Sequence, residues 1–258
     1  MRLFALSDPH LSFGVPNKKM DRFGAVWVDH AAKMQAAWDE SVGAKDIVLV
    51  PGDISWAKRF EDVLPDLEWL HARPGIKILL KGNHDLWWPS ATLLDQALPS
   101  SLRYIQHNSL RVGPFHFFGS RLWDTDEYSV FDLIEWDPKK GSVPGVLSDA
   151  DKVNQQKLFE RELQRLMLSI DTLPKQALKD GEIRVGLTHY PPIDHLLNPT
   201  RPAKLLKEAG AKHVVFGHLH SVKESWKGKA FGVWEGVHFH LTSCDYLEMA
   251  PKLICESP

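Results

Sequence analysis

The chain has 258 residues, of which 43% are hydrophobic and 25% charged, and its formal net charge is −2. This length lies near the upper limit of what one hydrophobic core supports, so we expect a single domain over residues 1–258. The composition excludes a disordered or fibrous chain. The near-neutral charge argues against a surface built to wrap nucleic acid.

Cysteine usage and the hydropathy pattern bear on the compartment. The two cysteines, Cys244 and Cys255, are too few for a disulfide framework and lack metal-ligand spacing, which fits a reducing environment. The first residues read as a strand rather than a signal peptide, and no apolar run approaches the ~20 residues of a membrane span. We therefore expect a cytoplasmic protein without a membrane partner; the sequence indicates no particular oligomeric state.

Short apolar runs that end in polar or turn-forming residues predict buried strands. In chain order they are Met1 to Leu6, Asp46 to Val50, Ile76 to Leu80, Ile183 to Leu187, and His213 to Phe216. Between them, apolar residues recur at helical period, first at Ala31, Met34 and Trp38 and later from Phe159 to Ile170, after a cap at Ser148. Strands that alternate with helices predict an α/β layered fold.

Three other stretches lack this alternation. Strand-like runs with short Gly or Pro turns fill Leu102 to Trp123 and Lys229 to Cys255, which predicts antiparallel additions to the sheets. The segment Asp124 to Val146 begins with acidic residues, contains several Pro and Gly, and has no steady period. We expect it to form a long surface loop or lid.

Five short clusters each follow the C-terminal end of a predicted strand. They are Asp8-Pro9-His10, Gly52-Asp53, Gly82-Asn83-His84-Asp85, His189, and Gly217-His218-Leu219-His220. Ligands bind at this edge of open α/β sheets, so the five segments would bring nitrogen and oxygen donors into one crevice. The glycines let the backbone turn sharply and approach bound ions closely. Together the clusters predict a metal site.

In order and spacing, these clusters resemble the motifs of the calcineurin-like metallophosphoesterase family, which are D-x-H, G-D, G-N-H-D or G-N-H-E, a lone H, and G-H-x-H. All five are present between Asp8 and His220. The resemblance implies a four-layer α/β/β/α sandwich, in which two mixed β-sheets are flanked by helices. It also places a dinuclear metal site at the C-terminal edge of the strands.

The resemblance further implies two ligand sets that share Asp53. One metal ion would be held by Asp8, His10, Asp53 and His220, and the second by Asp53, Asn83, His189 and His218. Such donors suit Mn, Fe, Zn, Ni or Co, and we favour Mn or Fe. Two such ions would leave the centre positively charged, which favours an anionic substrate. The implied reaction is hydrolysis of a phosphomonoester or phosphodiester through a metal-bridging hydroxide.

By the same resemblance, His84 is the catalytic histidine, which stabilises the transition state or protonates the leaving oxygen. Asp85 would orient the ring of His84, although a helix N-cap is a nearly equal interpretation. Trp56 stands where the purple acid phosphatase branch has a metal-binding tyrosine, so we expect a different kind of centre. The ending of the third motif in Asp85 rather than Glu separates the chain from the protein serine/threonine phosphatases.

Three residues are candidates for substrate contact. Arg121 follows a strand-like run and could bind phosphate through its guanidinium group, although a surface salt bridge fits equally well. Trp87 lies with Trp56, Trp88 and Trp123 near the motif loops, where an aromatic wall could stack a nucleobase, although core packing is the more common role. Tyr190, beside His189, could touch substrate or simply pack.

Alternatives to a simple phosphoesterase remain open. A pyrophosphohydrolase that cleaves a nucleotide diphosphate bond would need a larger groove. A non-catalytic protein-binding scaffold would not require every ligand position and His84 to be filled, as they are here. A nuclease would use the same two-metal chemistry, but the chain lacks a Lys/Arg-rich arm. The expected partner is therefore a small phosphate ester, which could be a nucleotide.

Overall fold

The computed structural model describes residues 1–135 and 148–257. The part of the expected loop that falls within 136–146 lies outside the described residues. The described α-helices are α1 (His30–Ser41), α2 (Phe60–Ala72), α3 (Ala91–Ala97), α4 (Asp149–Asp171) and α5 (Arg201–Glu208). Three short 3-10 helices accompany them: η1 (Met20–Phe23), η2 (Ala25–Trp27) and η3 (Glu224–Trp226).

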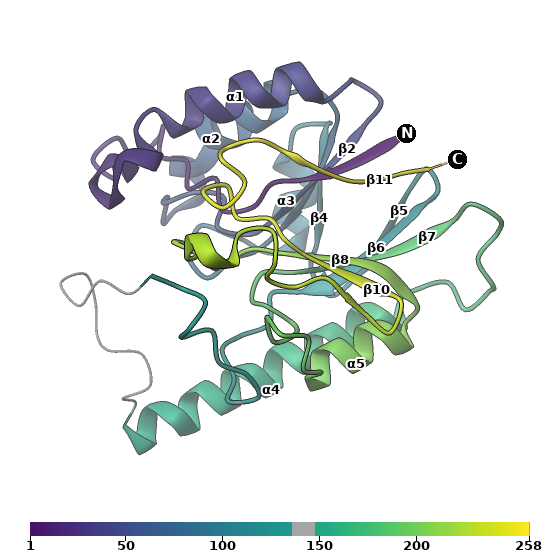
Figure 1. Cartoon of the computed structure of the whole chain (residues 1–258). Helices are drawn as coiled ribbons and strands as arrows, with labels where there is room; N and C mark the ends of the chain where they lie inside the picture. The colour runs from purple at the N-terminus through teal and green to yellow at the C-terminus, as the bar shows by residue number, and fades with distance from the viewer. Residues whose placement is uncertain (136–147, 258) are drawn as a thin grey trace.

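The strands form two mixed sheets (Figure 1). The first has the order β11-β1-β2-β3-β4, with bounds Lys252–Glu256, Arg2–Ala5, Ile47–Pro51, Ile76–Leu80 and Leu102–Ile105. The second has the order β5-β6-β7-β8-β10-β9, with bounds Ser109–Val112, Phe115–Ser120, Ile183–Thr188, Ala211–Phe216, Val237–Leu241 and Val233–Trp234.

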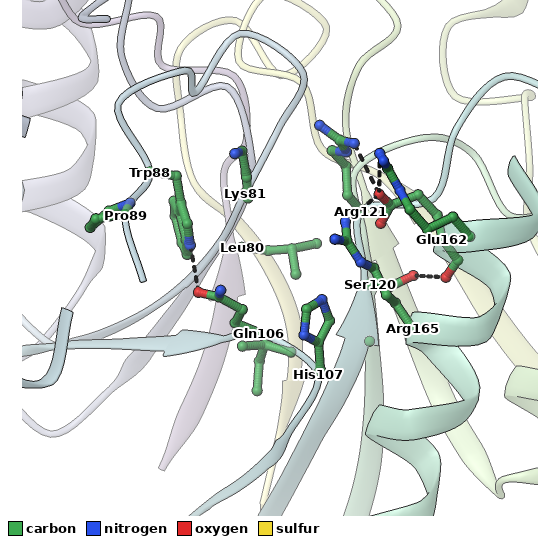
Figure 2. Close-up of a pocket in the computed structure, with 13 residues that line it drawn as sticks. Leu80, Lys81, Trp88, Pro89, Gln106, His107, Ser120, Arg121, Glu162 and Arg165 are labelled. Atoms are coloured by element: carbon green, nitrogen blue, oxygen red, sulfur yellow. Dashed lines mark hydrogen bonds and ion pairs between the residues drawn. The ribbon is translucent and has the colours of Figure 1, made fainter. Parts of the chain in front are cut away.

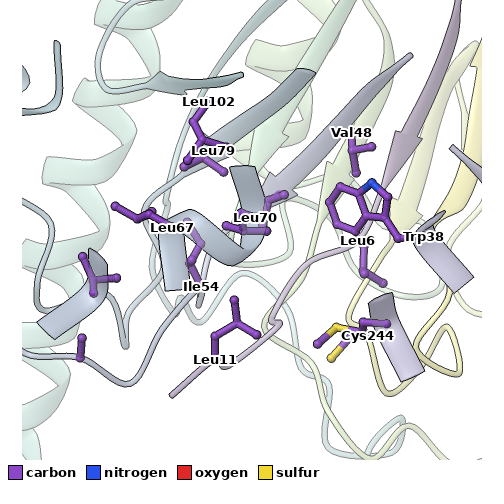
Figure 3. Packing of buried hydrophobic residues seen from close by; sticks show 14 of the residues in the cluster. Leu6, Leu11, Trp38, Val48, Ile54, Leu67, Leu70, Leu79, Leu102 and Cys244 are labelled. Carbon is purple, nitrogen blue, oxygen red and sulfur yellow. The ribbon is translucent and has the colours of Figure 1, made fainter. Parts of the chain in front are cut away.

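Three buried cores lie between four layers, which confirms the expected α/β/β/α sandwich. Alternation along β1 shows how the sequence builds them, because Leu3 and Ala5 enter the core between the sheets while Phe4 enters the core under the helices. Figure 3 shows that helix-side core, where Trp38 of α1 and Leu67 of α2 cover the first sheet. On the opposite side, α4 and α5 cover the second sheet (Figure 1).

The five strands expected from apolar runs are all present, with ends that differ from expectation by at most two residues. The two helices expected from periodicity are α1 and α4. The Ser148 hydroxyl accepts a hydrogen bond from the Asp151 backbone N–H at 3.2 Å, so the expected N-cap is confirmed.

The expectation of antiparallel additions is wrong for β4 and holds only in part for β6 and β10, each of which has one antiparallel and one parallel neighbour. β4 pairs with β3 in parallel, β6 pairs with β7 in parallel, and β10 pairs with β8 in parallel. Helical crossovers explain two of these pairings, since α3 returns the chain between β3 and β4, and α4 does so between β6 and β7. The antiparallel pairs among these segments are β5 with β6, β9 with β10, and β11 with β1.

The described part of the loop after β6, residues 124–135, is anchored to the second sheet's side of the molecule. Leu133 is fully buried, and Ile134 forms an isolated β-bridge with Val222, two residues beyond His220. Glu127 forms an ion pair with Arg201 at the start of α5. Among the residues that the structure describes, no helix is both long and apolar enough to cross a membrane.

Candidate metal centre

The strands β1, β2, β3, β7 and β8 end at one edge of the two sheets, and the loops that follow them meet there. The structure brings together all seven residues that the sequence predicts as ligands. Asp8 and His189 have no exposed surface, and His10 and Asp53 are each 2% exposed. Asn83, His218 and His220 are partly buried around them.

The first group of donors converges around two imidazoles. Nε2 of His10 lies 3.2 Å from Nε2 of His220. The same His220 nitrogen lies 3.7 Å from Asp8 Oδ1, and His10 Nε2 lies 3.8 Å from Asp53 Oδ2. Ligand atoms about 2.1 Å from one transition metal are separated from each other by about 3 to 3.4 Å, so this spacing is close to that of a metal site.

The second group gathers on the amide oxygen of Asn83. Its Oδ1 lies 2.7 Å from His189 Nε2 and 3.1 Å from His218 Nδ1. Oδ1 of Asp53 lies 3.5 Å from His189 Nε2, while its Oδ2 faces the first group. Each oxygen of the Asp53 carboxylate is therefore directed to a different group of donors.

Asp8, Asp53 and His189 also form a compact triplet of possible ligands. The approach of Asp8 to His189 is through Nδ1, at 4.0 Å, and Nδ1 already lies 3.0 Å from the Pro51 carbonyl oxygen. This carbonyl fixes the imidazole with Nε2 free toward Asn83 and Asp53. The second group therefore fits a metal better with Asn83 than with Asp8.

The backbone at the centre is held in an unusual conformation. Four of the candidate ligands have positive φ: Asp8 (57°), His10 (44°), Asp53 (51°) and His218 (69°). Non-glycine residues rarely adopt this region, and such strain is concentrated at functional sites. A side chain at Gly82 would overlap the Asp53 carboxylate, and one at Gly217 would overlap the Asp8 carboxylate. These two glycines allow the loops to approach closely enough for the carboxylates to converge.

Asp245 is a supporting residue that no sequence motif predicts. Its Oδ1 lies 2.8 Å from His220 Nδ1, and its Oδ2 accepts a hydrogen bond from the Ser221 N–H at 3.0 Å. This contact directs His220 Nε2 toward Asp8 and His10. Asp245 belongs to none of the five motifs, so its only sequence signal is a carboxylate soon after a strand-like run.

Burial sets the protonation of the candidate ligands. It lowers the pKa of His10 and of His218, and lowers the pKa of His189 to about 3, so these imidazoles are neutral and keep a lone pair for a metal. Burial also raises the pKa of Asp8 to about 7. For His220, burial lowers the pKa, but Asp245 and the nearby carboxylates raise it to about 9. Carboxylates, imidazoles and an amide oxygen are a donor set that fits transition-metal cations, and a metal at His220 would have to displace the proton that Asp245 stabilises.

His84 stands at the open side of the centre. Its side chain is 44% exposed, and its Nε2 lies 4.0 Å from Asp53 Oδ2. Its backbone N–H donates to Asp53 Oδ1 at 2.8 Å. The indole of Trp56 packs against the rings of His84 and His10, with centroids 4.6 and 5.0 Å away. Trp27, which lies outside the five motifs, packs edge-on against the rings of His10 and His220.

The two roles expected for Asp85 are both corrected by its contacts. Its carboxylate is fully buried and accepts hydrogen bonds from the N–H groups of Gly82, Ile54 and Ser55 and from the Trp87 indole. In the described part of the chain no hydrogen bond or ion pair joins Asp85 to the His84 ring, and Ser90 caps the next helix. Buried backbone N–H groups require a hydrogen-bond acceptor, and Asp85 provides it for both loops. Its carboxylate therefore links the loop after β2 to the loop after β3.

Of the four tryptophans expected to form an aromatic wall, Trp87 and Trp88 are largely buried, Trp123 packs against Tyr190 and Trp56 packs against His84. Trp87 is 3% and Trp88 8% exposed, and both belong to the core between the first sheet and its helices. Tyr190 is 3% exposed, and its ring lies 3.9 Å from that of His218. Trp87 and Tyr190 are therefore packing residues. Their rings fill the cores beneath the loops that carry His84 and His189. Trp56 is the half-buried tryptophan that borders His84.

Arg121 lies in a cavity of about 330 Å³ beside the candidate ligands rather than among them. The cavity opens at the C-terminal ends of β3, β4 and β6, next to α4. In Figure 2, Lys81 and Trp88 stand on one side and Arg121, Glu162 and Arg165 on the other, with Leu80 between them. Arg121 also links the cavity to the centre, since its carbonyl accepts hydrogen bonds from the N–H groups of His189 and Tyr190.

The chain belongs to the calcineurin-like phosphoesterase family, whose sequence model matches residues 1–222. This membership agrees with the expectation from the five motifs and identifies the chain as a phosphoesterase in the general sense. The candidate ligand clusters agree with the metal dependence of the family.

Two curated relatives are similar over short segments. The chain is 39% identical over 79 residues to the Gene 66 protein of Mycobacterium phage D29, and 42% identical over 57 residues to that of Mycobacterium phage L5. These matches span 31% and 22% of this chain, and 38% and 27% of the relatives. The chain thus matches well under half the length of either relative.

The chain is similar to solved structures at low sequence identity. Phosphopantetheinyl hydrolase from Mycobacterium tuberculosis aligns with a TM-score of 0.55 and 15% identity, covering 100% of this chain and 96% of that one. A protein of unknown function from Aquifex aeolicus aligns with a TM-score of 0.47 and 13% identity, covering 98% and 95%. The first similarity supports the fold alone.

Proposed function

We propose that the chain is a metal-dependent hydrolase of a phosphomonoester or phosphodiester. Its dinuclear centre would be held by Asp8, His10, Asp53 and His220 on one side and by Asp53, Asn83, His189 and His218 on the other. The observation that carries this proposal is the orientation of Asp53, whose two carboxylate oxygens face different groups of donors at 3.5 and 3.8 Å. A bridging ligand requires this arrangement.

The residues around the proposed centre would have separate roles in the reaction. When bound, the metal ions would lower the pKa of a water nucleophile and offset charge on the phosphate oxygens. Pro51 and Asp245 hold the imidazoles of His189 and His220 so that Nε2 of each faces the centre. His84, which is partly exposed next to Asp53, would donate a hydrogen bond or a proton to the departing oxygen.

The test is hydrolysis of an aryl phosphodiester and of the matching monoester by metal-stripped protein reconstituted with Mn²⁺. We expect about two metal ions per chain by elemental analysis, and activity that depends on them. The His84→Ala chain should retain metal and lose activity by about 10²-fold or more. The Asp53→Ala chain should lose both metal and activity, because both donor groups lose a carboxylate oxygen.

The outcomes separate the proposal from its rivals. Preference for the diester would indicate nucleotide-like substrates, and preference for the monoester would indicate a phosphatase. An inert protein that binds two ions would reject simple ester hydrolysis and favour a diphosphate substrate. An inert protein that binds no metal after reconstitution would support a binding scaffold.

A further inference from the structure

The cavity beside the candidate metal centre contains more positive than negative side chains. Three arginines converge on Oε1 of Glu162, at 3.0 Å from Arg121 Nη2, 2.6 Å from Arg165 Nη1 and 3.5 Å from Arg161 Nη2. Glu162 is 2% exposed, and one arginine would suffice to neutralise it. The other two guanidinium groups are therefore held close together without a matching negative charge.

Lys81 adds a fourth positive charge on the opposite wall. Within the ranges 1–135 and 148–257, no hydrogen bond or ion pair to the Lys81 ammonium group is present. Arg121 also has unused capacity, because its Nε is buried and finds no hydrogen-bond acceptor among the described residues. Four basic groups thus face a single carboxylate across an open cavity, where an anion with several oxygens would satisfy them.

The position of the cavity connects it to the reaction. Lys81 lies two residues before Asn83, on the loop that carries His84. The carbonyl oxygen of Arg121 accepts hydrogen bonds from the backbone N–H groups of His189 and Tyr190, at 3.1 and 3.0 Å. A volume of about 330 Å³ accommodates a small anionic group, since ligand pockets begin at about 300 Å³. The cavity and the candidate metal centre are therefore neighbours that share the loop after β3 and the backbone contact at Arg121.

We propose that this cavity is a second anion subsite, formed by Lys81, Arg121, Arg161 and Arg165, that binds a phosphate group of the substrate other than the one cleaved. The substrate class is then a phosphate ester whose alcohol part carries another phosphate. This inference rests on the proposed function, because it takes the first phosphate to lie at the metal centre.

The test compares α,ω-alkanediol bisphosphates of increasing chain length with alkyl monophosphates of the same length, using the Mn²⁺-loaded chain and phosphate release as the signal. We expect a higher kcat/KM for the bisphosphate at the length that spans the two sites. Lys81→Gln and Arg165→Gln should each reduce the ratio of bisphosphate to monophosphate kcat/KM by about tenfold, as expected for one lost hydrogen bond between charged groups. Lys157→Gln removes the same charge from the exposed face of α4 and should leave the ratio unchanged.

A binding measurement separates the subsite from the activity. Calorimetric titration of the Mn²⁺-loaded His84→Ala chain with the bisphosphate and the monophosphate measures the same preference as a difference in affinity, with turnover strongly reduced. In one outcome, the unchanged protein hydrolyses neither the bisphosphate nor the monophosphate and still binds the bisphosphate more tightly. If Lys81→Gln then abolishes this difference in affinity, the subsite is supported and the proposed function is rejected. Equal affinity for both ligands at every length, or a preference that survives Lys81→Gln and Arg165→Gln, would overturn the subsite. Because Lys81 makes no described ion pair, its replacement tests the subsite without disturbing Glu162.

Discussion

Asp245 forms a hydrogen bond and an ion pair with His220, and among the described residues it forms neither with any other candidate ligand. Its carboxylate accepts the Nδ1 hydrogen of His220, which makes Nε2 a better electron donor. We expect Asp245→Asn, which keeps the shape and removes the charge, to weaken Mn²⁺ binding by roughly 10- to 100-fold. Metal titration followed by calorimetry measures this change.

A matched control is Glu248→Gln, because Glu248 lies three residues further along the chain, is 82% exposed and pairs only loosely with Lys227. Its affinity for Mn²⁺ should equal that of the unchanged protein. If Asp245→Asn also bound Mn²⁺ with unchanged affinity, the orientation of His220 would not depend on this carboxylate.

At this scale, the sequence predicted the residues that sit in motifs and missed those that act through tertiary contact. Asp53 and His189 could be placed because each follows an apolar strand, and parallel strands end at a shared edge. Asp245 and Trp27 could not, since their contacts with His220 join separate segments that no local pattern relates. Asp85 was misassigned for the same reason, because its partners Ile54 and Ser55 come from another loop.

Among the elements, β10 shows why strand direction was harder to predict than strand position. Its hairpin with β9 is local and was readable from short turns. Its parallel pairing with β8 is not local. It depends on β8 having an unpaired edge in the second sheet, which follows from the tertiary packing and not from the sequence near β10. The same argument applies to β4, whose direction follows from the helix α3 that the periodicity did not reveal.

The pairing of β8 and β10 also places two histidines together. Nδ1 of His213 lies 3.2 Å from Nε2 of His240, and burial lowers the pKa of His213 to about 4 and that of His240 to about 3. In the unfolded chain both imidazoles take up a proton as the pH falls below about 6.5, whereas in the folded chain they stay neutral down to about pH 4. The free energy of unfolding therefore rises with pH between about 4 and 6.5, and this contribution is lost as the pH falls through that window.

We therefore expect His240→Gln to flatten this pH dependence. Its melting temperature should fall less than that of the unchanged protein between pH 7 and pH 5, by a few degrees, since about 1 kcal/mol corresponds to roughly 2–4 °C at this size. Thermal unfolding followed by circular dichroism measures both curves. His71→Gln, on α2, controls for the loss of an imidazole elsewhere; identical slopes for His240→Gln and the unchanged protein would contradict the argument.

For the whole molecule, the layering was predictable and the cavity was not. The five motifs imply the sandwich because they occur together in one family of folds. The arginines of the cavity come from the residue after β6 and from α4, and only the packing of α4 on the second sheet brings them close to Lys81. A helix period identifies the buried face of α4 but not which residues of another layer its remaining side chains meet.

Metal binding should act on the stability of the entire sandwich, because the candidate ligands join loops of both sheets. At a free Mn²⁺ concentration 100 times the dissociation constant, binding adds about 2.7 kcal/mol, which corresponds to a rise in melting temperature of roughly 5–10 °C. Calorimetric melting with Mn²⁺ and with a chelator measures this difference. The Asp53→Ala chain should show no such rise, and equal melting temperatures for the unchanged protein in both conditions would count against a folded-state metal site.

The pairing of Asp8 with His220 has a consequence for how the protein is made. These residues are far apart in the chain, and the carboxylate that orients His220 comes later still, at Asp245. During synthesis from the N-terminus, β1 and the loop with Asp8 emerge long before His220 and Asp245. The nascent chain therefore cannot bring all of the candidate ligands and Asp245 together until Asp245 has left the ribosome.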